Sequence, residues 1–262
     1  MKAYCLASSS AGNCYILQFD INGVPTQIMV ECGIPMSDIY KKCNQNGIML
    51  NETECCLVTH GHNDHCLSAN KLSQMGIKVF ATKPTLERAK AKGEEIIPMQ
   101  RYNVAKGIAI MPFEVEHDID GAVGFVIKTP TECVIFINDC KYWKPNLINF
   151  KPNYVFIECN YDHIMVYAQY HQIKKDIESN TLFGDDLKEA QIKLKQHERN
   201  LNAHMSLHGT LRNLKKLNLR YCQAIFLMHL SDRYANEYRM KNDVQLSTGV
   251  RTYVCKKKGS IK

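Results

Sequence analysis

The stretch Thr59-His60-Gly61-His62-Asn63-Asp64-His65 brings three imidazoles and one carboxylate together within six residues. It lies between a short apolar strand expected at Cys55–Thr59 and a helix expected at Ser68–Gln74. A strand-to-helix loop can turn its side chains toward one point, and imidazole and carboxylate are ligand types that suit zinc without any thiolate. The stretch therefore predicts a metal site at the end of a strand.

Apolar runs on both sides of this loop predict two groups of strands. We expect strands at Tyr4–Leu6, Cys14–Phe19, Thr26–Val30 and Val79–Ala81, and later at Ile108–Glu116, Gly124–Thr129, Cys133–Ile137, Tyr154–Glu158 and Ala224–Met228. Turns are expected at 8–13 and Asn22-Gly23, helices at Ser37–Gln45 and Pro84–Lys92, and helix-like structure over the charged stretch Gln172–Leu219. Sheets in both halves with interspersed helices predict an α/β fold, an αββα sandwich over residues 1–262 as one domain.

The composition is that of a folded protein with an anionic partner. Of the 262 residues, 45% are hydrophobic and 23% charged, which allows a large core and argues against disorder. A net charge of +7 raises the local concentration of anions. No apolar stretch of about 18 residues is present, so we expect no membrane span.

The twelve cysteines predict a reducing compartment. They form no Cys-x-x-Cys pair, and the chain has no signal peptide, so we expect reduced thiols and a cytoplasmic location. Most of them adjoin apolar runs and are expected to be small buried hydrophobic residues.

Three further polar residues follow expected strands and complete a candidate ligand set. His117 follows Ile108–Glu116, Asp139 comes just after Cys133–Ile137, and His229 follows Ala224–Met228. A lone His or Asp after a strand is more often an ordinary turn residue. Their shared position at strand ends makes metal binding the better interpretation.

With these residues the sequence resembles the metallo-β-lactamase-fold hydrolases over nearly its whole length. The resemblance implies two metal ions, expected to be Zn²⁺, with Mn²⁺ or Fe as alternatives. It implies that His60, His62 and His117 hold the first ion, that Asp64, His65 and His229 hold the second, and that Asp139 bridges both. Glu31 stands where the family usually has Asp, a departure expected to affect only the support of the ligands.

The identity of the bridging residue bears on substrate class. The β-lactam hydrolases of the family use a cysteine near this place, so Asp139 makes lactam hydrolysis improbable and resembles the phosphodiesterases and thioesterases. Cys140 is expected to be a packed neighbour of the site.

Finer motifs resemble the YycJ/WalJ-like branch and the phage anti-Pycsar enzymes that cleave cyclic nucleotides. They are Ser8-Ser9-Ser10-Ala11-Gly12-Asn13, Glu158-Cys159-Asn160-Tyr161-Asp162, His204-Met205-Ser206 and His229-Leu230-Ser231. The family's Gly-His-Leu-Ser-Asn element is present only as Ala203-His204-Met205-Ser206-Leu207. Relative to that branch, residues 163–203 look like an insertion, expected to form a cap or a dimer contact.

The first functional interpretation is a cyclic-nucleotide phosphodiesterase, a phage counter-defence enzyme in the host cytoplasm, acting on a small anionic nucleotide as a homodimer. Two ions about 3.5–4 Å apart can activate a bridging water for in-line attack on phosphorus. Asp64 is expected to accept the water's proton, and His204 to bind a phosphate oxygen or protonate the leaving group. Tyr161, Tyr167 and Tyr170 could stack on a base or could pack in the core or in a dimer interface.

Other functions remain open at this level. A YycJ/WalJ-like DNA nuclease would need an open basic groove, to which Arg212, Lys215, Lys216 and Arg220 could contribute one helix face. A capped pocket would favour the cyclic nucleotide instead. A protein that only sequesters a nucleotide would need a degraded ligand set, and a thioester hydrolase would need a groove for a long carrier arm.

Overall fold

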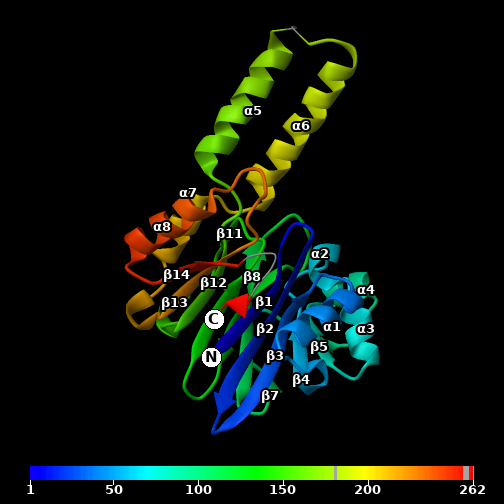
Figure 1. The fold of residues 1–262 in the computed structure, drawn as a ribbon, viewed down its shortest axis with the longest axis vertical. Helices are drawn as coiled ribbons and strands as arrows, with labels where there is room; N and C mark the ends of the chain where they lie inside the picture. Colours follow the sequence, from blue (N-terminus) through cyan, green and yellow to red (C-terminus); the bar gives the residue numbers. More distant parts are fainter. Residues whose placement is uncertain (180–181, 256–259, 262) are drawn as a thin grey trace.

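Two β-sheets pack face to face in the computed structural model, which describes residues 1–179, 182–255 and 260–261 (Figure 1). The first sheet has the order β15-β1-β2-β3-β4-β5-β6. Its strands are β1 (Lys2–Ser9), β2 (Gly12–Ile21), β3 (Val24–Cys32), β4 (Thr53–Leu57), β5 (Lys78–Ala81), β6 (Glu94–Glu95) and β15 (Ser260–Ile261).

The second sheet has the order β11-β8-β9-β10-β12-β13-β14, with β7 paired to β8. Its strands are β7 (Tyr102–Ala105), β8 (Ile108–Glu116), β9 (Val123–Lys128), β10 (Cys133–Ile137), β11 (Tyr142–Trp143), β12 (Tyr154–Glu158), β13 (Ala224–Met228) and β14 (Thr252–Val254). Strands β10, β12, β13 and β14 are parallel, and β8 runs in the same direction because β9 is antiparallel to both β8 and β10. The carboxyl ends of these strands therefore meet at one edge.

Helices cover the outer face of each sheet. The first sheet is covered by α1 (Met36–Gln45), α2 (Asn63–Cys66), α3 (Ala69–Gln74) and α4 (Lys83–Ala89), and the second by α7 (Leu207–Leu214) and α8 (Glu237–Thr248). Short 3-10 turns occur at Leu50–Glu52, Ile148–Phe150 and Leu219–Tyr221. The predicted α/β fold, an αββα sandwich, is confirmed.

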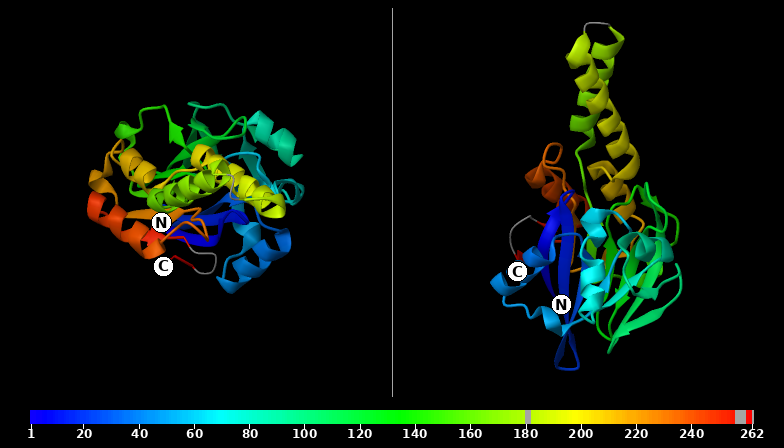
Figure 2. Two further views of the ribbon diagram at one scale, coloured as in Figure 1. Left: turned by 90° about the horizontal axis from the view of Figure 1, so that it is seen from above. Right: turned by 90° about the vertical axis from the view of Figure 1, so that its right-hand side faces the viewer.

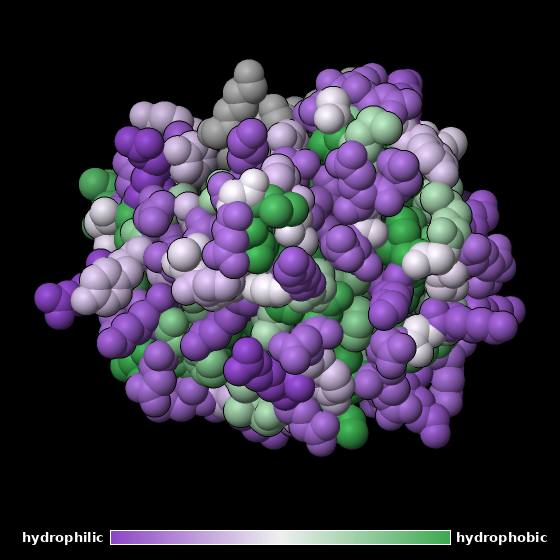
Figure 3. Space-filling model, turned by 90° about the horizontal axis from the view of Figure 1, so that it is seen from below, coloured by the Kyte–Doolittle hydropathy of each residue, from purple (hydrophilic) through white to green (hydrophobic). Residues whose placement is uncertain are grey.

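Strand β10 shows why the layers pack in this way. Val134 and Phe136 point into the core between the sheets, whereas Ile135 and Ile137 belong to the core beneath α7 and α8. All five residues of the strand are buried, as expected for a strand covered on both faces. The end of the molecule opposite α5 and α6 is mostly hydrophilic, with apolar side chains scattered in small groups (Figure 3).

Helices α5 (His163–Glu178) and α6 (Gly184–Ala203) form a hairpin that projects from the sandwich (Figures 1 and 2). We call it the α5–α6 hairpin. The less exposed residues of each helix recur every three or four positions, as in a helix pair. They include Val166, Tyr170, Ile173 and Ile177 on α5, and Leu187, Ala190, Leu194, His197 and Leu201 on α6. Each helix thus buries its apolar stripe against the other.

Several predicted boundaries differ from the structure. The turn predicted at 8–13 is shorter, because β1 runs to Ser9 and β2 begins at Gly12. Helix α4 ends at Ala89, where Lys90 adopts a left-handed conformation with φ 51°. The predicted helical stretch Gln172–Leu219 begins earlier, at His163, and is divided into three helices. Helix α8 was not predicted.

Among the described residues, no helix combines the length and apolarity needed to cross a bilayer. Eleven of the twelve cysteines are buried, Cys222 is half-buried, and no disulfide is found in the described part of the chain. Cys140 packs in the core beneath α7 and α8, as predicted for a neighbour of the site.

Candidate metal centre

The predicted ligands come from the carboxyl ends of strands in both sheets. His60, His62, Asp64 and His65 lie on or just after the loop that follows β4, with Asp64 and His65 in the short helix α2. His117, Asp139 and His229 follow β8, β10 and β13. The structure brings all seven side chains together at the edge where the two sheets meet.

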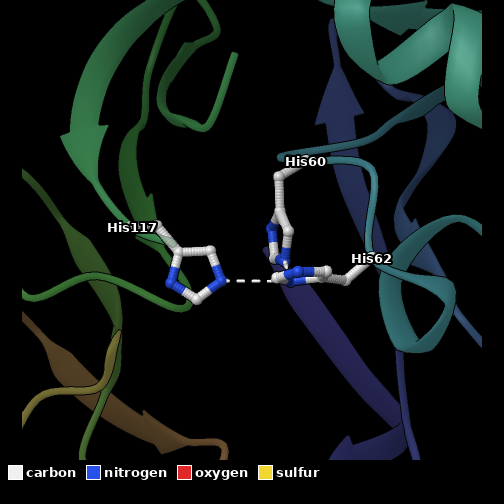
Figure 4. Close-up of side chains that lie close together, drawn as sticks. All are labelled: His60, His62 and His117. Atoms are coloured by element: carbon white, nitrogen blue, oxygen red, sulfur yellow. Dashed lines mark hydrogen bonds between the residues drawn. The ribbon is translucent and has the colours of Figure 1, made fainter. Parts of the chain in front are cut away.

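Three histidines form the first group. The Nδ1 atom of His62 lies 3.1 Å from Nε2 of His60 and 3.2 Å from Nε2 of His117. Figure 4 shows His60 and His62 on one loop, with His117 facing them from β8. A ring nitrogen carries at most one hydrogen, so His62 Nδ1 can satisfy only one of its two neighbours.

The second group consists of Asp64, His65, Asp139 and His229. Oδ2 of Asp139 lies 3.2 Å from Nε2 of His65, and Oδ1 lies 3.4 Å from Nε2 of His229. Oδ2 of Asp64 lies 3.3 and 3.6 Å from the same two nitrogens. The Asp139 carboxylate also faces the first group, with Oδ2 3.9 Å from His60 Nε2 and 3.8 Å from His117 Nε2.

A left-handed backbone, unusual for residues other than glycine, aims three of the side chains around the site. The φ angles are 44° at Asp139, 54° at His229 and 63° at Glu31. Such conformations cost free energy and cluster at functional sites. They turn the side chain away from the course of the strand and toward the gap between the sheets.

The His60–His65 loop also needs a glycine on the neighbouring strand. A Cβ atom on Gly33 would lie 1.7 Å from the backbone oxygen of Asp64 and 2.4 Å from the backbone nitrogen of His65. Gly33 therefore allows the loop backbone to approach the end of β3.

Glu31, Thr59 and His60 form a chain of hydrogen bonds that sets the orientation of the first ligand. The Thr59 hydroxyl donates to Oε1 of Glu31, so it must accept from Nδ1 of His60, 2.9 Å away. The Nε2 atom of His60 is then left with its lone pair toward the site. Glu31, predicted to support the ligands, is fully buried and also lies 3.4 Å from Nδ1 of His65.

The α5–α6 hairpin orients His117 in a similar way. Nδ1 of His117 donates to the carbonyl oxygen of Ala203 at the end of α6, at 3.1 Å. Two asparagines contact further ligand rings, Asn13 at 3.2 Å from Nε2 of His65 and Asn160 at 2.9 Å from Nδ1 of His229. The ligand set is therefore held by both sheets and by the hairpin.

The protonation states of His60, Asp64 and Asp139 suit a cation, whereas that of His65 must change when an ion binds. Burial acts to lower the pKa of His65, but the Asp139 and Glu31 carboxylates raise it well above its usual range, so a metal ion would have to displace its proton. Burial, together with the positive charge of His65, holds the pKa of His60 well below its usual range, so this imidazole is neutral. Burial would raise the pKa values of Asp64 and Asp139, but the neighbouring histidines lower both, so both carboxylates are ionised. Metal binding requires neutral imidazoles and ionised carboxylates.

Unpaired polar atoms at this site are a second observation that bears on whether these residues fit a metal ion. Asp139 Oδ1 and His229 Nε2 are buried without a hydrogen-bond partner among the described residues. Such orphaned atoms are uncommon and need a physical reason. Together with the facing ring nitrogens of the first group, they fit a site for divalent metal.

His204 lies beside this centre and is paired with Glu158. Nδ1 of His204 donates to Oε1 of Glu158 at 2.6 Å, and the His204 ring stacks on His229 at 5.1 Å between centroids. Burial acts to lower the pKa of His204, but the charge and hydrogen bond of Glu158 outweigh it and raise the pKa to about 9. His204 is therefore a cation at neutral pH.

A pocket of about 390 Å³ opens over the centre. It is lined by five of the predicted ligands and by His204, together with residues of other elements: Ser10, Asn63, Arg88, Gln196 and Arg199. Gln196 and Arg199 belong to α6, so the hairpin forms one wall of the pocket. The volume lies in the range of small-molecule sites.

The three tyrosines for which base stacking and packing were both left open do not line this pocket. Tyr161 is buried, Tyr170 lies on the packed face of α5, and Tyr167, although exposed, is not part of the lining. The expected basic helix face is wrong, because α7 ends at Leu214, before Lys215, Lys216 and Arg220. None of these basic residues lines the pocket, nor does Arg212.

No role was predicted from the sequence for Glu158, Asn13 or Asn160, although all three lie in the motifs that carried the finer resemblance, and Asp118 was not singled out. Glu158 ends β12, so the rule that found His117 and His229 would also have found it. Asp118 Oδ1 lies 3.1 Å from Nε2 of His117, and its Oδ2 accepts from Nε of Arg199 at 3.1 Å. No signal in the sequence links Asp118 to Arg199, because 81 residues separate them.

Comparisons with known proteins agree with this fold. Residues 35–230 match the family model of the beta-lactamase superfamily domain. No curated protein matches the sequence significantly.

Solved structures similar to this chain include the metallo-beta-lactamase fold protein YhfI from Bacillus subtilis, with 15% identity, a TM-score of 0.67 and coverage of 97% of this chain and 95% of that one. Zn²⁺-bound PqqB from Methylobacterium extorquens has 11% identity, a TM-score of 0.65 and full coverage of both chains. Human tRNase Z, short form, has 13% identity, a TM-score of 0.57 and coverage of 89% and 94%. The match to the family model covers most of the chain, so this protein belongs to the metallo-β-lactamase superfamily, whose members are metal-dependent hydrolases.

Proposed function

We propose that this protein is a phosphodiesterase that uses two divalent ions, expected to be zinc, to hydrolyse cyclic nucleotides. The observation that carries the proposal is a pair of ligand groups at a pocket walled by the α5–α6 hairpin. Asp139 belongs to the second group and faces His60 and His117 of the first at 3.9 and 3.8 Å. His60, His62 and His117 would hold one ion, and Asp64, His65 and His229 the other. A shared carboxylate in place of cysteine supports phosphoester chemistry.

When bound, the two ions would polarise a phosphoryl oxygen and activate water. Asp64 borders the pocket and accepts the proton released by the attacking water. His204 protonates the departing ribose oxygen, because Glu158 occupies its Nδ1 and its other nitrogen is free to act.

The resemblance to the anti-Pycsar enzymes supports cyclic nucleotides as the substrate class, and the pocket size fits a small molecule. A nuclease of the YycJ/WalJ-like kind is the alternative, and the likeness to a protein named tRNase Z keeps nucleic acid among the substrates to be tested. The basic residues expected to form a nucleic-acid groove do not line the site, which favours the small substrate.

The α5–α6 hairpin, residues 163–203, is proposed to serve as a cap and as the contact of a homodimer. Apolar side chains exposed on it are Ile164, Met165, Tyr167, Phe183 and Ile192. Sedimentation equilibrium tests the dimer: substitution of Phe183 and Ile192 by Asp should give a monomer. A wild-type monomer at all concentrations would refute the dimer without affecting the chemistry.

The proposed reaction is tested with cyclic mononucleotides, cyclic dinucleotides and linear single- and double-stranded DNA. Purified wild type is compared with the variant His62→Ala plus Asp64→Ala and with EDTA-treated protein. We expect metal-dependent turnover of cyclic compounds and intact DNA. Cleaved DNA with untouched cyclic nucleotides would replace the proposal with a nuclease, and no turnover of either would direct attention to thioesters or sequestration.

A further inference from the structure

Two arginines from distant parts of the chain line the same pocket as the candidate metal ligands. Arg88 lies in the last turn of α4, on the side of the first sheet, and Arg199 lies on α6 of the hairpin. Neither is needed to complete the ligand set. Their presence at one opening calls for a ligand of their own.

Arg88 can occupy its position because Gly61 has no side chain. A Cβ atom on Gly61 would lie 2.9 Å from Cδ and 3.2 Å from Cβ of Arg88, so the aliphatic part of the arginine runs across the His60–His65 loop. Arg88 is thereby placed in the lining of the pocket. Arg88 forms no ion pair among the described residues, which leaves its donors available to a ligand.

Arg199 is placed by Asp118. The Nε atom of Arg199 donates to Oδ2 of Asp118 at 3.1 Å, and Oδ1 of Asp118 lies 3.1 Å from Nε2 of His117. A guanidinium has five N–H groups, so the bond through Nε leaves the terminal amino groups for a second partner. The ion pair thus orients Arg199 toward the pocket without using up its donors.

One phosphodiester does not require both guanidinium groups at the opening, even though Asp118 offsets part of the charge of Arg199. A phosphodiester carries a single negative charge, which the candidate metal centre and His204 already attract. Two further guanidinium groups match a second anionic group, since arginine binds phosphate through paired, charge-assisted hydrogen bonds. A neutral base or sugar would need no such pair.

We infer that Arg88 and Arg199 bind a second phosphate of the substrate, next to the one that is cleaved. The inference rests on the proposed phosphodiesterase function and narrows its substrate class. The substrates are phosphodiesters with at least two phosphates, such as cyclic dinucleotides or 5′-phosphorylated linear dinucleotides. Compounds with one phosphate, such as cyclic mononucleotides, lack the group that the arginines recognise.

The kinetic experiment compares wild type with Arg88→Gln, Arg199→Gln and Arg199→Lys. The control is Lys195→Gln, an exposed α6 residue outside the pocket. Substrates are bis(4-nitrophenyl) phosphate, a cyclic mononucleotide, a cyclic dinucleotide and a 5′-phosphorylated linear dinucleotide. Each glutamine variant should raise KM for at least one two-phosphate substrate about tenfold or more, because hydrogen bonds to charged groups contribute about 1.5–3 kcal/mol. The KM for bis(4-nitrophenyl) phosphate should change less than about threefold.

A binding experiment gives a readout that does not depend on turnover. Calorimetry measures binding of a dinucleotide whose internal linkage is an uncleavable, neutral methylphosphonate, with and without a 5′-phosphate. The 5′-phosphate should strengthen binding to wild type and to Lys195→Gln, and the gain should disappear in Arg88→Gln and Arg199→Gln. Arg199→Lys should keep part of the gain, because its charge remains and its fork geometry is lost.

The outcomes separate the two proposals. If wild type hydrolyses no phosphodiester, the proposed function fails, and the calorimetric gain still decides the role of the arginines. If hydrolysis occurs but the variants weaken one-phosphate and two-phosphate substrates equally, the second phosphate site is refuted and the function stands. If the arginine variants raise KM for only the cyclic or only the linear dinucleotide, that result shows whether the second phosphate belongs to a cyclic or to a linear substrate.

Discussion

Asp139 holds a carboxylate at the junction of two ligand groups on a left-handed backbone with φ 44°. Asparagine has nearly the same shape and tolerates this conformation, so Asp139→Asn removes the charge and little else. We expect the purified variant to lose most of its metal, measured by inductively coupled plasma mass spectrometry, with an unchanged circular dichroism spectrum. Asp120→Asn, an exposed carboxylate outside both groups, should keep the metal content of wild type. Equal metal in both variants would exclude Asp139 as a shared ligand.

Gly33 lets the His60–His65 loop approach the end of β3, and this close contact can be tested by substitution. In Gly33→Ala the new methyl group would overlap the backbone of Asp64 and His65, so the loop must move. We expect loss of metal and destabilisation by at least about 2 kcal/mol in urea unfolding, as for other overpacked sites.

The matched control is Gly76→Ala, where φ is 87° and no atom lies within 4 Å of the new Cβ. This variant should lose only about 1 kcal/mol through backbone strain and keep its metal. Normal metal content in Gly33→Ala would show that the loop does not depend on this close approach.

At the residue scale, the sequence predicts which side chains gather but not how they are supported. His117, Asp139 and His229 could be found because each lies at a strand end, and β8, β10 and β13 do end there. The contact of His117 with the Ala203 carbonyl could not be found, because it joins residues 86 positions apart through the backbone. Left-handed conformations at Asp139 and His229 likewise have no sequence signal, since neither residue is glycine.

At the scale of elements, the α5–α6 hairpin depends on the contact between its two helices. Leu194 lies on the packed face of α6, and Lys195, its neighbour, is exposed. Leu194→Asp should separate the helices and increase amide hydrogen exchange over 163–203, because most of the stability of a helix in a protein comes from the packing of its apolar face. Lys195→Asp should exchange like wild type.

The same substitution tests how far the hairpin folds independently. Exchange in β8, β10 and β12 should stay slow in Leu194→Asp, since the sandwich has its own core. Faster exchange throughout the chain would mean that the hairpin and the sandwich unfold as one unit.

Elements with a strong apolar pattern were predictable, and those defined by tertiary contacts were not. The bounds of β8, β10, β12 and β13 agree with the sequence pattern because β10 and β13 are continuous apolar runs and β8 and β12 are largely apolar, with glutamates only toward their carboxyl ends. Helix α5 was expected to begin at Gln172, but it begins at His163, where Asp162 caps it by accepting from the backbone nitrogen of Ile164. Its first turns mix apolar and polar residues, so the pattern alone does not distinguish them from a loop.

At the scale of the whole molecule, the metal centre should join the two sheets. The candidate ligands follow strands of both layers, β4 in one and β8, β10 and β13 in the other. Ions bound only by the folded state stabilise it by about 4 kcal/mol at a thousandfold excess over Kd, which for a chain of this size corresponds to roughly 10 °C. EDTA treatment should therefore lower Tm by that amount, and added zinc should restore it. Asp139→Asn should show a much smaller response, and an equal response would place the stabilising metal elsewhere.

The buried cysteines predict that the protein loses stability in alkali. Burial raises the pKa values of the Cys43 and Cys133 thiols to about 11 and that of Cys159 to about 12, whereas a thiol in the unfolded chain has a pKa of about 8.5. Below about pH 8 both states keep these protons and stability does not change. Between about pH 8.5 and 11 the unfolded chain releases them while the folded protein retains them, so stability falls as pH rises.

Each such thiol should lower the free energy of unfolding by about 1.4 kcal/mol per pH unit within that range. Urea unfolding of EDTA-treated protein at pH 7.5, 8.5, 9.5 and 10 measures the slope without interference from metal binding. Cys43→Ala should be less stable than wild type at pH 7.5, because it leaves a small cavity, but its stability should fall less steeply with pH. The two curves therefore converge toward pH 10. Parallel curves would mean that Cys43 keeps an ordinary pKa in the folded protein and that its burial has no part in the alkaline loss.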